Sequence, residues 1–286
     1  MKVCLKEPEP PSLANFRAAK PAAKWEEMKN DAHNGGQEAY ADVKRSLVRA
    51  QRGLCAYCER QIAPAVDNDS IRSKTQGQRV EHYHSKSDST PAKNWALDWN
   101  NLWAVCTGGN NRPPTGEIAD TAEFLEPAAE NLSCDAAKER QITNGALDVA
   151  HEGLLLAPSD LPSFPPLFTC SSDGIVSPSE NCAKVSIVGN RLPSTEELVS
   201  DTIKHFNLNC GRLTERRRIV RSQLEKSMSS MRASSPHLQS SELSQTVARR
   251  FLTASGNSCW REFFTMIRDR LGEPAEAHLR ANNYAG

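Results

Sequence analysis

The segment that decides the fold is Gln51-Arg-Gly-Leu-Cys-Ala-Tyr-Cys-Glu59, in which Cys55 and Cys58 form a C-x-x-C pair. A turn with this spacing brings both thiolates to one side of the chain, within reach of one tetrahedral zinc ion. Cys106 and Cys134 follow downstream, on either side of a stretch rich in glycine and proline. The sequence therefore predicts a structural zinc site with four ligands, Cys55, Cys58, Cys106 and Cys134.

The same cysteines admit two other interpretations. Ordinary buried thiols are common in protein cores, and a C-x-x-C pair also occurs in redox proteins. No β-α-β pattern surrounds Cys55 and Cys58, so the zinc site is favoured over a redox centre. The remaining cysteines lack ligand spacing and are expected to be core thiols: Cys4, Cys170, Cys182, Cys210 and Cys259.

Charge and hydropathy limit the classes of protein to which the chain can belong. The chain has 286 residues with 35 basic and 35 acidic side chains, so its formal net charge is zero. A zero total neither supports nor excludes a nucleic-acid partner, because such partners bind to local patches. No run of eighteen apolar residues occurs, and the first residues lack the apolar core of a signal peptide. We expect a globular protein in the cytoplasm, where thiols stay reduced.

The pattern along the chain predicts an α+β fold in three parts. Residues 1–50 form an N-terminal arm and helix, with prolines favouring an extended course for residues 1–22. Residues 51–145 form the functional core, and residues 146–286 form a mostly helical C-terminal region. Within that last region we expect a small hairpin at residues 168–178 and two long helices at 194–232 and 246–272. A serine-rich link is expected at residues 229–245.

An acid–histidine segment, Val80-Glu-His-Tyr-His-Ser-Lys86, lies between the C-x-x-C pair and Cys106. Hydrolysis of a phosphodiester needs a divalent metal to stabilise charge and a base to take a proton from water. Histidine suits the base because its pKa lies near neutrality, and a carboxylate suits a hard cation. His82 and Glu81 are therefore candidates for these two tasks, although His82 alone is equally compatible with a surface or core histidine.

Three polar residues further along complete the set. Asn101, in Leu97-Asp-Trp-Asn-Asn-Leu102, could hold the histidine loop by bonding to its backbone. Asp135 and Lys138 follow Cys134 on one face of an expected helix, where Asp135 could reach a metal and Lys138 a phosphate. Taken singly, Asn101 is compatible with a turn residue and Asp135 with a helix N-terminal acid. The functional interpretation depends on the order in which these residues occur along the chain together with the four cysteines.

That order resembles the HNH endonuclease family. The pattern of a C-x-x-C knuckle, an acid–His pair, Asn-Leu and a cysteine with a downstream lysine is carried by Cys55–Cys58, Glu81-His82, Asn101-Leu102, Cys106 and Cys134–Lys138. The chain is similar in more detail to the PtuB-like subgroup, the HNH nucleases of Septu-type and retron-linked antiphage systems. The resemblance is specific over residues 51–138 and looser out to about residue 270.

The resemblance implies a zinc-stabilised ββα-metal core and a role for each motif residue. His82 would be the general base, Asn101 would orient the base loop, and Glu81 and Asp135 would hold a catalytic Mg²⁺ or Mn²⁺. His84, Lys86 and Lys138 would contact the substrate, and His84 could instead join the metal. Asn110 or Asn111 is the alternative to Asp135 as the third HNH position.

The sequence thus predicts a metal-dependent nuclease that hydrolyses nucleic acid, with DNA favoured over RNA. The subgroup implies a PtuA-like ABC-type ATPase partner, and a retron reverse transcriptase with its DNA as a further one. A zinc-stabilised module that binds a partner without catalysis, and a redox protein, are the alternatives. A basic run (Arg212, Arg216, Arg217, Arg218 and Arg221) is compatible with a DNA-facing surface or with a solvated helix face.

Overall fold

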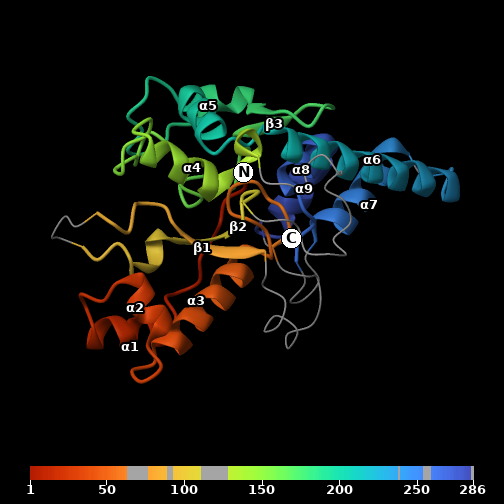
Figure 1. Cartoon of the computed structure of the whole chain (residues 1–286). Coiled ribbons are helices and arrows are strands. Elements are labelled where there is room, and N and C mark those ends of the chain that lie inside the picture. Colours follow the sequence, from red (N-terminus) through yellow and green to blue (C-terminus); the bar gives the residue numbers. More distant parts are fainter. Residues whose placement is uncertain (63–76, 89–92, 111–127, 238, 254–258, 285–286) are drawn as a thin grey trace.

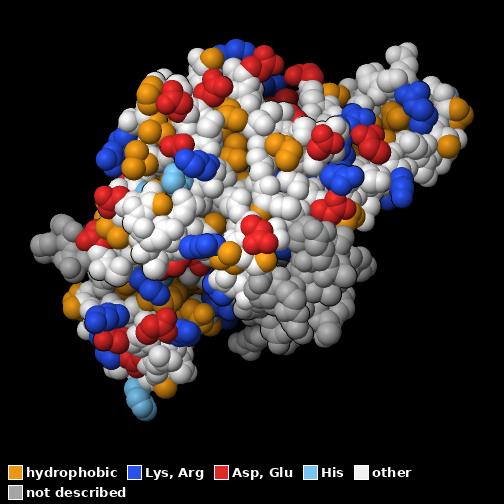
Figure 2. Space-filling view, turned by 45° about the horizontal axis from the view of Figure 1, so that its top comes forward, with side chains coloured by type: hydrophobic (Ala, Val, Ile, Leu, Met, Phe, Trp, Pro, Cys, Tyr) orange, Lys and Arg blue, Asp and Glu red, His pale blue; other side chains and the backbone are white. Residues whose placement is uncertain are grey.

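The computed structural model describes residues 1–62, 77–88, 93–110, 128–237, 239–253 and 259–284. It is mostly helical, with two small antiparallel sheets of two strands each, which confirms the α+β class. None of the described helices combines the length and apolarity needed to cross a bilayer. On the face seen in Figure 2, acidic and basic side chains of the described residues are interspersed rather than segregated.

The N-terminal region consists of three packed helices, α1 (Pro11–Ala19), α2 (Trp25–Asn30) and α3 (Gly36–Ala50). The predicted extended arm is therefore wrong for residues 11–19. Pro11 occupies the first helical position, where its fixed φ favours a helix and its missing N–H costs nothing. Helix α3 buries a stripe that includes Ala39, Val43 and Leu47, which recur every four residues along one face.

The central unit comprises strands β1 (Gln78–His82) and β2 (Leu102–Cys106) and helix α4 (Cys134–Thr143). The strands pair antiparallel, with Glu81 opposite Trp103 and His82 opposite Leu102. Helix α3 lies along this unit (Figure 1) and contacts β2, as α4 does. Residues 102–106 form a strand and residues 99–101 a short 3₁₀ turn, which places Asn101 directly before β2.

Buried Gln51, just past the end of α3, ties the cysteine knuckle to this sheet. Its side-chain Nε2 donates to the carbonyls of Leu54 and Ala104, and its Oε1 accepts from the Ala104 N–H at 2.8 Å. The Ala56 N–H donates to the same Ala104 carbonyl at 3.1 Å. The chain that carries Cys55 and Cys58 is thereby fixed against β2 at Ala104, two residues before Cys106.

The C-terminal region contains the hairpin of β3 (Phe168–Cys170) and β4 (Val176–Pro178), followed among the described residues by a short 3₁₀ helix (Glu180–Lys184) and then by five α-helices. They are α5 (Thr195–His205), α6 (Gly211–Ser234), α7 (Ser240–Leu252), α8 (Phe264–Leu271) and α9 (Glu273–Ala281). The hairpin is confirmed. The predicted serine-rich link is wrong for residues 229–234 and 240–245, which belong to helices α6 and α7.

Both long helices predicted in this region are interrupted. Helix α5 ends before Asn207, which adopts φ +46° while the Leu208 N–H bonds back to the Ile203 carbonyl at 2.9 Å. This left-handed C-terminal closure is one that asparagine tolerates, and it separates α5 from α6. Residues 246–272 likewise form parts of α7 and α8 rather than one helix, and Phe263, at φ +57°, directly precedes α8.

Candidate active site and metal centre

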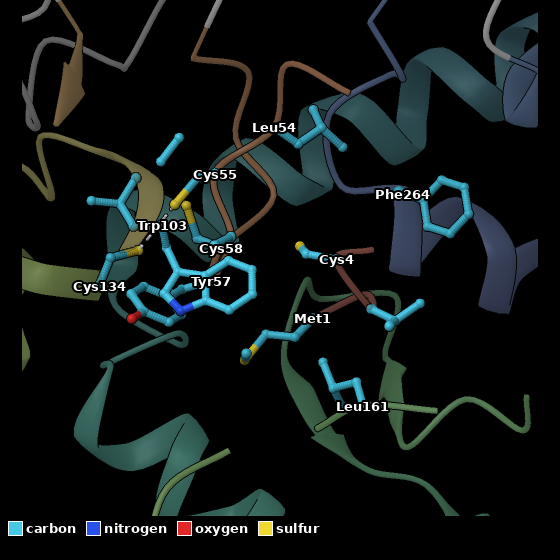
Figure 3. Packing of buried hydrophobic residues seen from close by; sticks show 14 of the residues in the cluster. Met1, Cys4, Leu54, Cys55, Tyr57, Cys58, Trp103, Cys134, Leu161 and Phe264 are labelled. Atoms are coloured by element: carbon cyan, nitrogen blue, oxygen red, sulfur yellow. Dashed lines mark hydrogen bonds between the residues drawn. The ribbon is translucent and has the colours of Figure 1, made fainter. Parts of the chain in front are cut away.

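The four predicted zinc ligands meet in one buried cluster. The sulfurs of Cys55, Cys58, Cys106 and Cys134 all lie within 4.8 Å of one another. The Cys55–Cys134 and Cys106–Cys134 sulfurs are 3.8 Å apart, and the Cys58–Cys106 sulfurs are 3.7 Å apart. Figure 3 shows the Cys55 and Cys134 side chains pointing toward each other beside the rings of Tyr57 and Trp103.

These separations fit a metal and exclude disulfides. Zinc–sulfur bonds of about 2.3 Å in a tetrahedron place neighbouring sulfurs about 3.8 Å apart, whereas a disulfide needs about 2.05 Å. Burial raises the pKa of the Cys55 and Cys134 thiols, so four thiolates this close need a cation to stabilise them. The buried tetrathiol set therefore fits a structural zinc site.

Local backbone geometry brings the sulfurs together. In the knuckle, the Cys55 N–H donates to the Arg60 carbonyl at 2.8 Å and the Glu59 N–H to the Cys55 carbonyl at 3.1 Å, with Glu59 at φ +63°. Cys134 is the first residue of α4, and its N–H donates to the Phe206 carbonyl at 2.8 Å. The Phe206 ring stacks on Tyr57 with centroids 4.0 Å apart, so the end of α5 closes over the knuckle.

Beside this cluster, β1 and α4 bring three charged side chains into contact. Glu81 and Lys138 form a buried ion pair, and Asp135 lies within hydrogen-bonding contact of Glu81. Burial raises the pKa of the Glu81 carboxyl well above its usual range, Asp135 raises it further and Lys138 opposes the shift. Two adjoining carboxyl groups from different elements are a donor set that suits a hard divalent cation.

The Lys138 side chain is buried, and its ammonium group bonds to other groups of the protein. Its side chain is 2% exposed, and its Nζ donates to the carbonyls of His82 at 2.8 Å and Tyr83 at 2.9 Å in addition to the pair with Glu81. The ammonium thus fixes the backbone of the acid–histidine segment. Its expected contact with a phosphate stays a prediction.

His82 lies at the end of β1 with its ring buried. Its Nε2 is 3.1 Å from the Ala96 carbonyl oxygen, and the ring meets Trp25 of α2 edge to face at 4.7 Å. Burial lowers the pKa of His82 to about 4, so the imidazole is neutral near pH 7. Because a carbonyl only accepts, Nε2 carries the proton, which leaves Nδ1 with the lone pair that a general base requires.

Asn101 cross-links the segments on both sides of this ring. Its Oδ1 accepts from the His84 N–H at 2.7 Å, and its Nδ2 donates to the carbonyls of His84 at 3.0 Å and Trp95 at 2.9 Å. Trp95 directly precedes Ala96, whose carbonyl contacts the His82 ring. The Asn101 side chain therefore ties the backbone of His84 to the segment that contacts this ring. These are the contacts that the predicted orienting role requires.

The remaining predicted substrate residues lie in different surroundings. The buried His84 ring contacts Glu152 through Nδ1 and Asp88 through Nε2, the latter at 2.7 Å, and it stacks on Trp95 at 3.9 Å. Lys86 is on the surface, 3.9 Å from Glu26. Both ring nitrogens of His84 already have carboxylate partners in the protein, while the Lys86 ammonium remains accessible.

Asp135 opens onto a groove of about 490 Å³ that is also lined by Arg79, Asn110, Glu139 and Arg140. Arg79 Nη1 lies 3.9 Å from Asp135 Oδ2. Asn110, one alternative for the third HNH position, therefore borders the same groove as Asp135, and Asn111 lies outside the described residues. Sequence reasoning missed Arg79, although its position two residues before Glu81 on a strand puts both side chains on one face.

Neither interpretation of the basic run fits two of its five arginines. Arg212 and Arg217 are buried, at 4% and 3% exposure. Arg216 pairs with Glu262 at 2.6 Å and Arg218 with Glu215 at 2.7 Å. Both the DNA-facing surface and the solvated face are therefore wrong for the two buried members, which point into the protein.

Comparison with known proteins identifies one relevant relative. No family model matches the chain. A curated Escherichia coli protein described as "Retron Ec83 putative HNH endonuclease" is 38% identical over 222 residues, which cover 76% of this chain and 78% of the relative. Identity at this level over three quarters of both chains extends well beyond the motif residues.

Proposed function

This chain belongs to the HNH endonuclease family, and we propose that it hydrolyses phosphodiester bonds of nucleic acid, DNA in preference to RNA. The observation that carries the proposal is the contact of Glu81 with Asp135 between β1 and α4, beside the cysteine cluster, with a neutral His82 directly after Glu81 at the end of β1. Such a ββα-metal arrangement combines a cation site with a base that is unprotonated at neutral pH.

The residues of the chain divide the work of hydrolysis as follows. Glu81 and Asp135 would hold Mg²⁺ or Mn²⁺, which supplies charge stabilisation to the phosphate and the leaving oxygen. His82 accepts the proton of the attacking water at Nδ1 while its Nε2–H stays on the Ala96 carbonyl. Asn101 and Lys138 keep that ring and its backbone in place. The cysteine cluster, with zinc, fixes α4 relative to the sheet.

The groove beside Asp135 is the proposed path of the nucleic-acid backbone. Arg79 and Arg140 provide guanidinium groups there, and guanidinium geometry matches phosphate oxygens. Once a cation takes up the charge of Asp135, Arg79 is released from its partner to bind phosphate. We propose Asp135, rather than Asn110 or Asn111, as the third HNH residue because it alone of the described candidates contacts Glu81.

The biological setting we propose is antiphage defence as a PtuB-like effector. The support is the relative, whose name links an HNH endonuclease to a retron. On this proposal the chain acts with an ABC-type ATPase of the PtuA kind, and with a retron reverse transcriptase and its DNA as the sensing part.

The test is cleavage of plasmid DNA and of RNA with Mg²⁺ or Mn²⁺, with and without the ATPase. Four proteins are compared: wild type, His82→Ala, Asp135→Asn, and His33→Ala as a control at an exposed histidine. We expect cleavage by wild type and the control, and a loss of about 100-fold or more without the base. Equal cutting by His82→Ala would remove His82 from the mechanism, and zinc-loaded wild type that cuts under none of these conditions would favour the non-catalytic binding module.

A further inference from the structure

A zinc centre with four cysteine thiolates carries two surplus negative charges, because four thiolates meet one divalent ion. In this fold the four sulfurs are buried, with side chains no more than 8% exposed. Buried charge is costly unless opposite charge or hydrogen-bond donors lie nearby. The molecule therefore needs compensating cations close to the cluster, and helix α6 brings two.

Arg212, on the first turn of α6, packs between the two segments that carry Cys106 and Cys134. Its Nη2 donates to the Ser133 hydroxyl at 2.7 Å, directly before Cys134. Its Nε lies against Gly109, three residues after Cys106, where an added Cβ would come within 3.2 Å. That buried Nε has no hydrogen-bond partner among the described residues, so the guanidinium charge lies between the segments that carry Cys106 and Cys134.

Arg217 approaches the cluster from the side of the knuckle. It lines a small cavity together with Tyr57, Cys58 and Glu59. Its Nη1 donates to the Gly174 carbonyl at 3.0 Å, which holds the guanidinium in the cavity that Cys58 also lines. The Glu59 carboxylate lines the same cavity and also accepts from the Thr265 N–H at 2.8 Å.

The partners of these two arginines differ from those of their neighbours on the same helix. Arg216 and Arg218 each have a carboxylate within 4.0 Å, at Glu262 and Glu215. Arg212 and Arg217 form no such ion pair within the described part of the chain, although both are buried. A buried guanidinium needs negative charge nearby, and the thiolate cluster supplies it beside Arg212 and, together with the Glu59 carboxylate, beside Arg217.

We propose that Arg212 and Arg217 neutralise the zinc–tetrathiolate centre, so that the C-terminal region completes the metal site of the nuclease core. Zinc is then retained tightly only while α6 is docked. This role depends on the zinc cluster alone, and it holds whether or not the chain cleaves nucleic acid.

The experiment measures zinc release from the purified full-length protein to a colorimetric chelator. We expect Arg212→Met and Arg217→Met to release zinc about 10- to 100-fold faster than wild type, the range found for outer-shell residues of metal sites. Arg218→Met, at an exposed arginine of the same helix, is the matched control and should release zinc at the wild-type rate. Release by both Met variants at the control's rate would overturn the proposal.

Two further variants separate charge from packing. Arg212→Lys keeps the charge and should stay within about threefold of wild type; release as fast as from a folded Arg212→Met protein would contradict charge compensation. In a Cys106→His background the centre has one thiolate fewer, so Arg212→Met should accelerate release less than it does in wild type. If Arg212→Met accelerates zinc release as much in the Cys106→His background as in wild type, that result would also contradict charge compensation. If Arg212→Met does not fold, the lysine variant decides: wild-type retention supports the proposal and rapid loss overturns it.

Discussion

The side-chain oxygen of Asn101 accepts the His84 N–H at 2.7 Å, while the amide nitrogen of the same side chain donates to the His84 carbonyl at 3.0 Å. One side chain thus saturates both backbone groups of a residue seventeen positions earlier in the chain. This reciprocal pair fixes the turn that follows β1. We propose that the turn in this way helps to position the general base, His82, from a segment that follows it in the chain.

Replacing Asn101 with alanine should cost both stability and activity. The change leaves the His84 N–H and two buried carbonyls without partners, and we expect the free energy of unfolding to fall by about 2–4 kcal/mol. Cleavage by the folded fraction should fall further, because the base loop loses its anchor. Denaturant unfolding and cleavage rates check both. Asn100→Ala, at the exposed neighbouring position, should change stability by less than about 0.5 kcal/mol; a similar loss in both variants would argue against the anchor.

The Lys138→Met variant distinguishes a structural lysine from a phosphate ligand. In the structure the ammonium is buried against Glu81, so its removal leaves a buried carboxyl without its cation, and stability should fall by about 3–5 kcal/mol. Lys29→Met, which removes an exposed pair with Glu26, should cost less than about 1 kcal/mol. If Lys138→Met instead keeps its stability and only raises KM, the phosphate contact predicted from the sequence is the correct role.

Arg79→Gln tests the groove as the path of the substrate. We expect KM for DNA to rise about tenfold with a smaller change in kcat, since the contact positions the substrate, and the salt dependence of binding should weaken by about one counterion. Binding is measured with Ca²⁺ in the His82→Ala background, and KM and kcat with Mg²⁺ in the protein that retains His82. Arg45→Gln, on the surface of α3, is the control. Unchanged binding in Arg79→Gln would place the nucleic acid elsewhere.

The sequence predicts part of this arrangement because the type and spacing of the metal-ligating residues are visible in the motif itself. A C-x-x-C turn and a cysteine at the start of a helix need little tertiary information, and the cluster of Cys55, Cys58, Cys106 and Cys134 is confirmed. The HNH family is likewise confirmed by the relative. The contacts of Asn101 agree with its expected role, which the Asn101→Ala variant tests.

Other features depend on packing that no local pattern encodes. The burial of Lys138 follows from the register of α4 against β1, and one carboxylate partner of His84, Glu152, comes from a segment 68 residues away. The breaks in the predicted C-terminal helices depend on single residues with positive φ, such as Asn207 and Phe263. The inward orientation of Arg212 and Arg217 could not be read from a helix rich in arginine.

Lys6 gives a prediction about pH. Its ammonium is largely buried, donates to the Trp99 carbonyl at 2.6 Å and lies over the Trp103 ring, and burial lowers its pKa from 10.5 to about 7. Between these two values the unfolded chain binds one proton more than the folded chain at this site, so raising the pH stabilises the fold. The contribution is complete above about pH 10.5 and is lost as the pH falls through about 7.

The check is chemical denaturation of wild type and Lys6→Met between pH 7 and pH 9.5. The wild-type free energy of unfolding should rise relative to that of Lys6→Met by up to about 1.4 kcal/mol per pH unit. Parallel profiles for the two proteins would show that the buried ammonium does not titrate in this range.

The central claim, that Glu81 and Asp135 hold one divalent cation beside His82, is tested most directly by anomalous diffraction from crystals of the His82→Ala protein soaked with Mn²⁺. The account predicts a manganese peak between the two carboxylates, with Mn–O distances of about 2.0–2.2 Å, and a separate zinc peak among the four sulfurs. A zinc peak without manganese at Glu81 and Asp135, or manganese bound elsewhere, would contradict it.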